Sequence, residues 1–169
     1  MPVDVRSQID IARPREEVAA FAADPDNAPR WYTNIKRVEW KSPRPIRMGS
    51  LIAFVAQFLG RTIAYTYEVK ELVPNERFVM ATAEGPFAME TTYEWSDTPS
   101  GGTMMTLRNR GKPSGFSKVA APIMASAMRK ANGKDLARLR SICEAEPLDW
   151  TAVLVHRRQA RSSQWMICG

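Results

Sequence analysis

Histidine and cysteine are scarce in this 169-residue sequence, which has only His156, Cys143 and Cys168. A zinc site needs four nitrogen or sulfur ligands, and small secreted domains usually carry more cysteines as disulfides. We therefore predict no metal site and two reduced thiols. His156 stands beside two arginines near the end of the sequence, which disfavours a nucleophilic triad built on it.

Sequence motifs typical of common enzyme classes are also missing. The sequence has no His-Glu-x-x-His pair, no Walker A loop and no dinucleotide-binding glycine fingerprint. Glu90 and Glu94 fall on the polar phase of a predicted strand, opposite Arg108 and Arg110 on the next. We expect surface ion pairs there rather than acid–base residues. The sequence thus predicts no cofactor and leans away from an enzyme.

Long hydrophobic runs are absent as well. The most apolar stretch, Leu51 to Gly60, is interrupted by Gln57 and is about half of the ~20 residues that a membrane span needs. The opening Met-Pro-Val-Asp-Val-Arg does not resemble a secretory signal. We therefore expect a cytoplasmic protein.

Charge is biased to one sign without being concentrated. The net charge is +6. Residues 147–169 hold Arg157, Arg158 and Arg161 against Asp149, so that +2 lies there and +4 is spread over the rest. Nucleic-acid binders more often show a basic stripe interleaved with aromatic residues. We expect no specific nucleic acid and at most weak contact with an anionic membrane surface.

The sequence does contain a series of segments whose apolar residues recur at strand or helix spacing. Val3 to Ile11 alternates as a half-buried strand. A helix is predicted after Pro14, ending at Asp24-Pro25, and a second short helix over residues 26–32. Six further strands follow, separated by turn signals: Ile35–Lys41, Leu51–Leu59, Thr62–Leu72, Arg77–Ala83, Phe87–Ser96 and Thr103–Arg110.

The period then becomes helical. An apolar stripe runs from Phe116 to Cys143, with a break near Asn132-Gly133. The helix that carries it should end near Glu146-Pro147. Short turns imply an antiparallel sheet, and only this helix is long enough to cover its apolar face. We predict an α+β domain over residues 1–146. Residues 147–169 are interpreted as a C-terminal extension, with disorder as one alternative.

Three segments in this order resemble a known superfamily. Ile11–Val18 resembles its strand-to-helix transition, Tyr67–Arg77 its central strand and turn, and Asp135–Arg140 the end of its last helix. The sequence is similar over residues 3–146 to the helix-grip fold of START-like lipid-transfer proteins, birch-pollen-type allergens and bacterial polyketide cyclases (the SRPBCC superfamily). The resemblance implies a curved sheet of about seven strands and a long C-terminal helix that together enclose a cavity.

We expect this cavity to be lined by apolar and aromatic side chains with a few polar groups. Gln57, Thr91 and Asn109 are the polar candidates, and Trp31 and Tyr32 are expected at the entrance. The remaining predicted ligand-binding residues are Phe54, Phe58, Tyr65, Tyr67, Met89, Tyr93, Met105, Leu107, Ile123, Met124 and Met128. Each of them also fits an ordinary core position.

Three functions remain open at this point. The first is binding of a hydrophobic small molecule, such as a lipid, polyketide or aromatic compound, by a monomer or homodimer. The second is a polyketide cyclase, aromatase or dehydratase that uses Tyr65, Tyr67 or Asn109. The third is an interaction module that uses the basic surface.

Overall fold

Seven strands form one continuous sheet in the computed structural model, which describes residues 2–112 and 121–145. The strand order is β1-β7-β6-β5-β4-β3-β2, and every neighbouring pair is antiparallel. The strands are β1 (Val3–Ile11), β2 (Ile35–Trp40), β3 (Leu51–Phe58), β4 (Arg61–Val73), β5 (Arg77–Glu84), β6 (Ala88–Asp97) and β7 (Thr103–Lys112). The predicted α+β architecture is confirmed.

Local turn chemistry sets the hairpins. Leu59 and Gly60 join β3 to β4 with φ values of 47° and 74°. Positive φ at both positions is what a two-residue type I′ turn requires. Asn75, in the turn between β4 and β5, also has a positive φ of 62°, which asparagine tolerates better than most residues.

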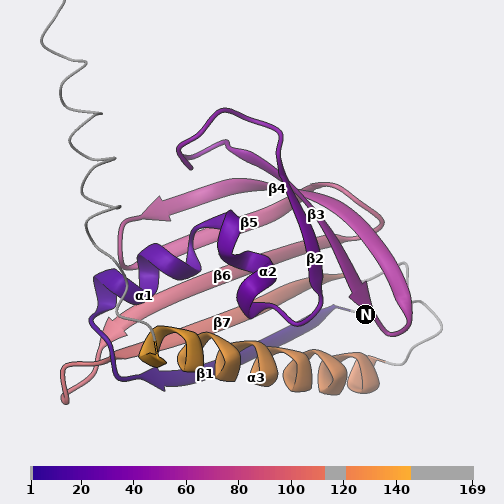
Figure 1. The fold of residues 1–169 in the computed structure, drawn as a ribbon. Coiled ribbons are helices and arrows are strands. Elements are labelled where there is room, and N and C mark those ends of the chain that lie inside the picture. Colours follow the sequence, from indigo (N-terminus) through magenta and orange to yellow (C-terminus); the bar gives the residue numbers. More distant parts are fainter. Residues whose placement is uncertain (1, 113–120, 146–169) are drawn as a thin grey trace, which may run out of the picture.

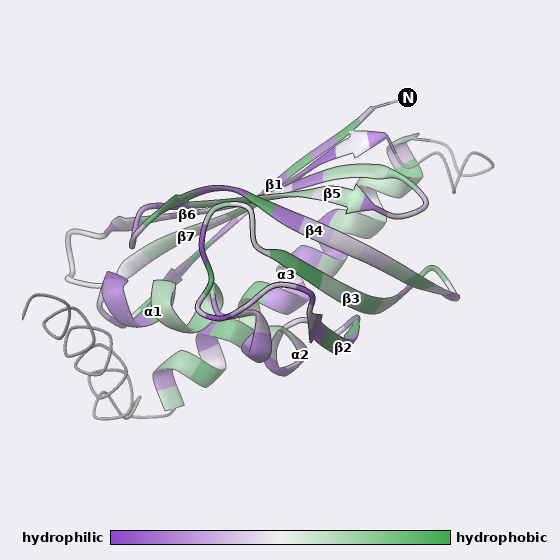
Figure 2. Ribbon diagram, turned by 90° about the horizontal axis from the view of Figure 1, so that it is seen from above, coloured by the Kyte–Doolittle hydropathy of each residue, from purple (hydrophilic) through white to green (hydrophobic). Residues whose placement is uncertain are grey.

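The sheet is bent by irregularities in the pairing of β4 with β5. Strand β4 has 13 residues, and its register against β5 shifts between Thr66 and Tyr67 and again between Val69 and Glu71. Each bulge bends a strand and increases its twist. The sheet therefore curves, and Figure 2 shows it arching over the helices.

All the helices lie on the same face of the sheet (Figure 1). They are α1 (Arg15–Ala22), the 3-10 helix η1 (Pro25–Asn27), α2 (Ala28–Trp31) and α3 (Ala121–Ala145). The Asp24 carboxylate accepts a hydrogen bond from the Asp26 N–H and caps η1. The long helix α3, orange in Figure 1, runs alongside β1.

Helix α3 is the long C-terminal helix expected from the sequence. It runs without interruption from Ala121 to Ala145, through the break in the apolar stripe near Asn132-Gly133. Asn132 is only 5% exposed, and its side-chain carbonyl accepts a hydrogen bond from Asn109 Nδ2 at 3.0 Å. A polar residue on the apolar stripe is therefore held by a partner on the sheet, and the helix continues through it.

The larger of two hydrophobic clusters extends beneath the C-terminal half of α3. Leu136, Leu139 and Cys143 are at most 1% exposed there, and they pack with Val18 of α1 and Leu107 of β7 in one cluster. A smaller cluster gathers near the N-terminal half of α3 around Val3, Val5, Ile63 and Met124. The C-terminal half of α3 thus packs into the larger cluster, and the N-terminal half into the smaller one.

Some predictions concern residues beyond the described part of the chain. The 147–169 extension, with His156 and Cys168, lies outside it, as does the stripe before Ala121. Among the helices of the described part, none is long and apolar enough to cross a membrane. Cys143 is fully buried.

Candidate functional site

A cavity of about 150 Å³ lies between the concave face of the sheet and the N-terminal half of α3. Segments far apart in sequence supply its walls: the α2–β2 region, strands β3 to β7, and α3. Its lining is mostly apolar and aromatic. The lining residues that the sequence analysis did not predict for the cavity are Ala28, Asn34, Ile35, Ala56, Ile63, Met80, Phe87, Ala131, Asn132 and Asp135.

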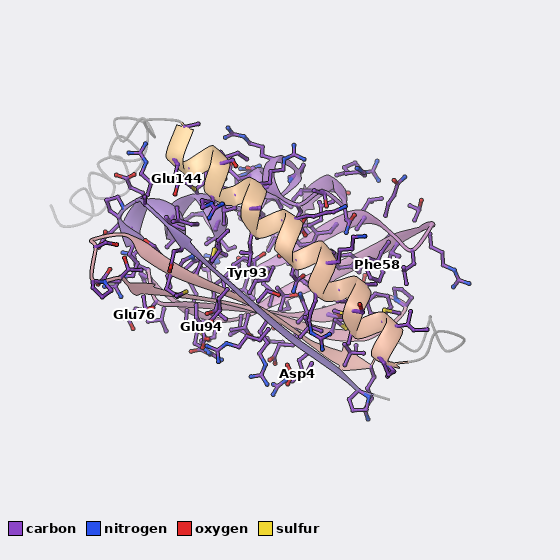
Figure 3. All side chains as sticks on the ribbon, turned by 90° about the horizontal axis from the view of Figure 1, so that it is seen from below. Asp4, Phe58, Glu76, Tyr93, Glu94 and Glu144 are labelled. Atoms are coloured by element: carbon purple, nitrogen blue, oxygen red, sulfur yellow. The ribbon has the colours of Figure 1, made fainter. Side chains whose placement is uncertain are left out.

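Ten of the fifteen predicted ligand-binding residues line this cavity. Asn109, which the sequence analysis named both as an inward-facing polar group and as a catalytic candidate, lines it too. Figure 3 marks Tyr93 near the middle of α3 and Phe58 towards its N-terminal half. The ten are Tyr32, Phe54, Phe58, Tyr65, Tyr67, Met89, Thr91, Tyr93, Met124 and Met128.

Three others are core residues. Trp31, Met105 and Leu107 are 0% exposed. Trp31 was expected at the entrance, but its ring is packed against Tyr32, with a centroid distance of 3.9 Å. Periodicity identifies the inward face of an element but does not tell cavity wall from filled core, because both are apolar.

The last two point elsewhere. Gln57 is exposed, because strand side chains alternate and its neighbours Ala56 and Phe58 both line the cavity. Ile123 is 62% exposed. The inward face of the helix is instead set by Met124 and Met128, one turn apart.

Four polar residues form a hydrogen-bonded chain across the cavity wall. The Thr91 hydroxyl donates to Asn109 Oδ1 at 2.9 Å. The Tyr67 phenol lies 3.1 Å from Thr91 Oγ1, and it is the donor because the Thr91 proton is already used. Asn109 Nδ2 then donates to Asn132 Oδ1. The chain joins β4, β6 and β7 to α3 and orients each polar group.

The tyrosines of the cavity stay neutral at physiological pH. Burial raises the pKa of Tyr67 to about 12, although its hydrogen bond with Thr91 lowers it somewhat. Burial also raises the pKa of Tyr32, Tyr65 and Tyr93. Each phenol therefore keeps its proton and can donate one hydrogen bond to a partner or ligand.

Asp135 is the main feature that the sequence analysis missed. It is 2% exposed and lines the cavity. The backbone N–H and the hydroxyl of Thr33 both donate to its Oδ1 atom at 2.8 Å. Burial raises the pKa of this carboxyl, against the lowering effect of the Thr33 bonds. A signal was available, because Asp135 interrupts the apolar stripe beside Leu136 and Leu139.

The carboxylates on the outer face of the sheet form ion pairs with arginines. Glu90 pairs with Arg110 at 2.8 Å, as predicted. Glu94 pairs with Arg77 of β5 and not with Arg108. Arg108 instead donates a hydrogen bond to Asp4 on β1. Within residues 2–112 and 121–145, no three His, Cys, Asp or Glu side chains gather as metal ligands would.

The family model described as polyketide cyclase / dehydrase and lipid transport matches residues 2–144. The chain belongs to this family. The SRPBCC relationship and the helix-grip fold expected from the sequence are thereby confirmed. No curated protein matches the sequence.

Solved structures with the same fold are distant in sequence. TTHA0849 from Thermus thermophilus is 20% identical with a TM-score of 0.72, covering 84% of this chain and 97% of its own. A START superfamily protein from Mycobacterium smegmatis is 14% identical, with the same TM-score and the same coverage. The Zhui aromatase/cyclase from Streptomyces sp. R1128 is 14% identical with a TM-score of 0.69, covering 85% and 94%. These likenesses show the fold alone.

Proposed function

We propose that this protein binds a hydrophobic small molecule in the cavity between its sheet and α3. The observation that carries the proposal is the lining itself. Aromatic rings and methionines make up most of the wall, and the polar groups are few. Ligand pockets in general combine an apolar wall with a small number of oriented polar groups.

The apolar side chains of the wall support the same conclusion. An apolar ligand would remove the aromatic and methionine surface that lines the cavity from water. Burial of apolar surface stabilises a complex by roughly 25 cal/mol per Å². The proposal keeps the expectation of a cytoplasmic monomer or homodimer without a specific nucleic-acid partner.

Native mass spectrometry of the purified protein tests the proposal, followed by solvent extraction of anything released. We expect a stoichiometric apolar adduct. Ala131 lines the cavity from α3, so Ala131→Leu should fill part of the space and abolish the adduct. Ala137 is exposed on the same helix, and Ala137→Leu is the matched control. A ligand retained equally by both variants would place binding elsewhere.

A cyclase, aromatase or dehydratase is the second candidate. The Tyr67 phenol, oriented by Thr91 and Asn109 at the cavity wall, favours it. A neutral phenol can polarise a substrate carbonyl by hydrogen bonding. If so, Tyr67→Phe should lower the turnover of a poly-ketone substrate by about 10²-fold or more. Tyr65→Phe is the matched control, and equal turnover in both variants would count against catalysis by Tyr67.

A further inference from the structure

Two residues of α3 that line the cavity each have one side-chain polar atom with no hydrogen bond to the described residues. Asn132 uses its Oδ1 atom to accept from Asn109, while its Nδ2 atom is buried and unbonded. Asp135 uses only Oδ1, for Thr33. Both residues line the cavity and are at least 95% buried. They are three positions apart and hence neighbours on one helix face.

These two atoms require opposite partners. Asn132 Nδ2 is a donor and needs an acceptor, whereas Asp135 Oδ2 is an acceptor and needs a donor. A carbonyl only accepts, so it would leave Asp135 unpaired. An ammonium only donates, so it would leave Asn132 unpaired. A hydroxyl does both at a single oxygen, so that one small group complements the pair.

We propose that Asn132 and Asp135 bind the hydroxyl group of an apolar alcohol or phenol, with Asn132 Nδ2 donating to its oxygen and Asp135 Oδ2 accepting its proton. This inference rests on the proposed function and specifies the ligand class. An engineered cavity of about 150 Å³ in another protein holds benzene. The part of the ligand enclosed here is therefore about one ring in size.

The inference predicts discrimination between two molecules of one shape. 1-Phenylethanol carries a hydroxyl where acetophenone carries a carbonyl. Leaving a buried polar group unpaired weakens binding markedly. We expect isothermal titration calorimetry to show that the wild-type chain binds the alcohol about tenfold tighter than the ketone.

Asp135→Asn should reverse the preference. The amide keeps an oxygen for Thr33 but presents an N–H in place of Oδ2, so that two donors face the ligand. We expect the alcohol-to-ketone affinity ratio to shift by tenfold or more towards acetophenone. Glu90→Gln is the matched acid-to-amide control on the outer face of the sheet, and its ratio should equal that of the wild type.

The outcomes separate the two proposals. Equal binding of alcohol and ketone by the wild type would overturn the inference, since water then satisfies both groups, and would leave the proposed function standing. Binding of neither compound would overturn the inference, whereas the proposed function is decided separately by native mass spectrometry. An unchanged ratio in a folded Asp135→Asn chain would also overturn the inference. The wild-type comparison needs no variant, so it decides even where Asp135→Asn does not fold.

Discussion

The phenol oxygens of Tyr32 and Tyr93 lie 2.7 Å apart, although 61 positions separate them in the sequence. Tyr32 follows α2 and Tyr93 lies on β6. Trp31 and Phe78 pack against the Tyr93 ring at centroid distances of 5.7 and 5.6 Å. This hydrogen bond ties the short-helix segment to the sheet at the cavity wall.

Removing either hydroxyl should destabilise the fold, because the other hydroxyl then loses its hydrogen-bond partner. We expect Tyr32→Phe and Tyr93→Phe each to lower the free energy of unfolding by about 1–2 kcal/mol, because each leaves one buried hydroxyl unpaired. The double variant should lose less than the sum. Urea denaturation of the four proteins gives the coupling. Tyr65 is the control, since no hydrogen bond joins its hydroxyl to the described residues, and Tyr65→Phe should stay within about 0.5 kcal/mol. Additive losses would contradict the pairing.

Core and cavity residues should respond differently to truncation. Leu107 is 0% exposed and fully packed, so Leu107→Ala should cost about 2–5 kcal/mol. Met128 is half-buried and already borders empty space, so Met128→Ala should cost under about 1 kcal/mol. Denaturant unfolding measures both. Similar losses would mean that the space beside Met128 is filled in solution.

The buried carboxyl of Asp135 should make stability depend on pH. Its pKa in the folded state is raised above the usual 3.8 by burial, so the folded protein binds the proton more tightly than the unfolded chain does. The wild type should therefore lose stability relative to Asp135→Asn as pH rises from below 3.8 through the pKa of Asp135 in the folded state. Unfolding curves from about pH 3.5 to 7 test this. A shift in the opposite direction would mean that the Thr33 bonds outweigh burial.

Two glycines should respond to alanine with opposite signs. Gly111 pairs with Met89 across β6 and β7, and a Cβ there would lie 2.9 Å from the Met89 Cα and in contact with the Ala88 carbonyl. Gly111→Ala should separate the strands and cost about 1–3 kcal/mol. Gly133 lies in α3 with open space around it, so Gly133→Ala should stabilise the helix by up to about 1 kcal/mol. Thermal unfolding of both variants measures the signs, and a neutral Gly111→Ala would contradict the close approach.

Much of the architecture followed from the sequence. Alternation along Val3–Ile11 and the six later segments, with turn signals at Gly60 and Asn75, predicted the strands to within a residue or two. These features are local, because period and turn chemistry depend on residues a few positions apart. The order of the elements then supported the superfamily resemblance, and with it the cavity.

Only the tertiary structure separated cavity from core and identified the polar pair. Tyr67 and Met105 have the same inward phase on their strands, yet one lines the cavity and the other is fully packed. The difference depends on how far α3 stands from each point of a bent sheet, which no one-dimensional pattern contains. Asp135 likewise acquired its role from Thr33, 102 positions away. Sequence periodicity determines which face of an element is buried, whereas packing between distant elements determines where space and unpaired polar groups remain.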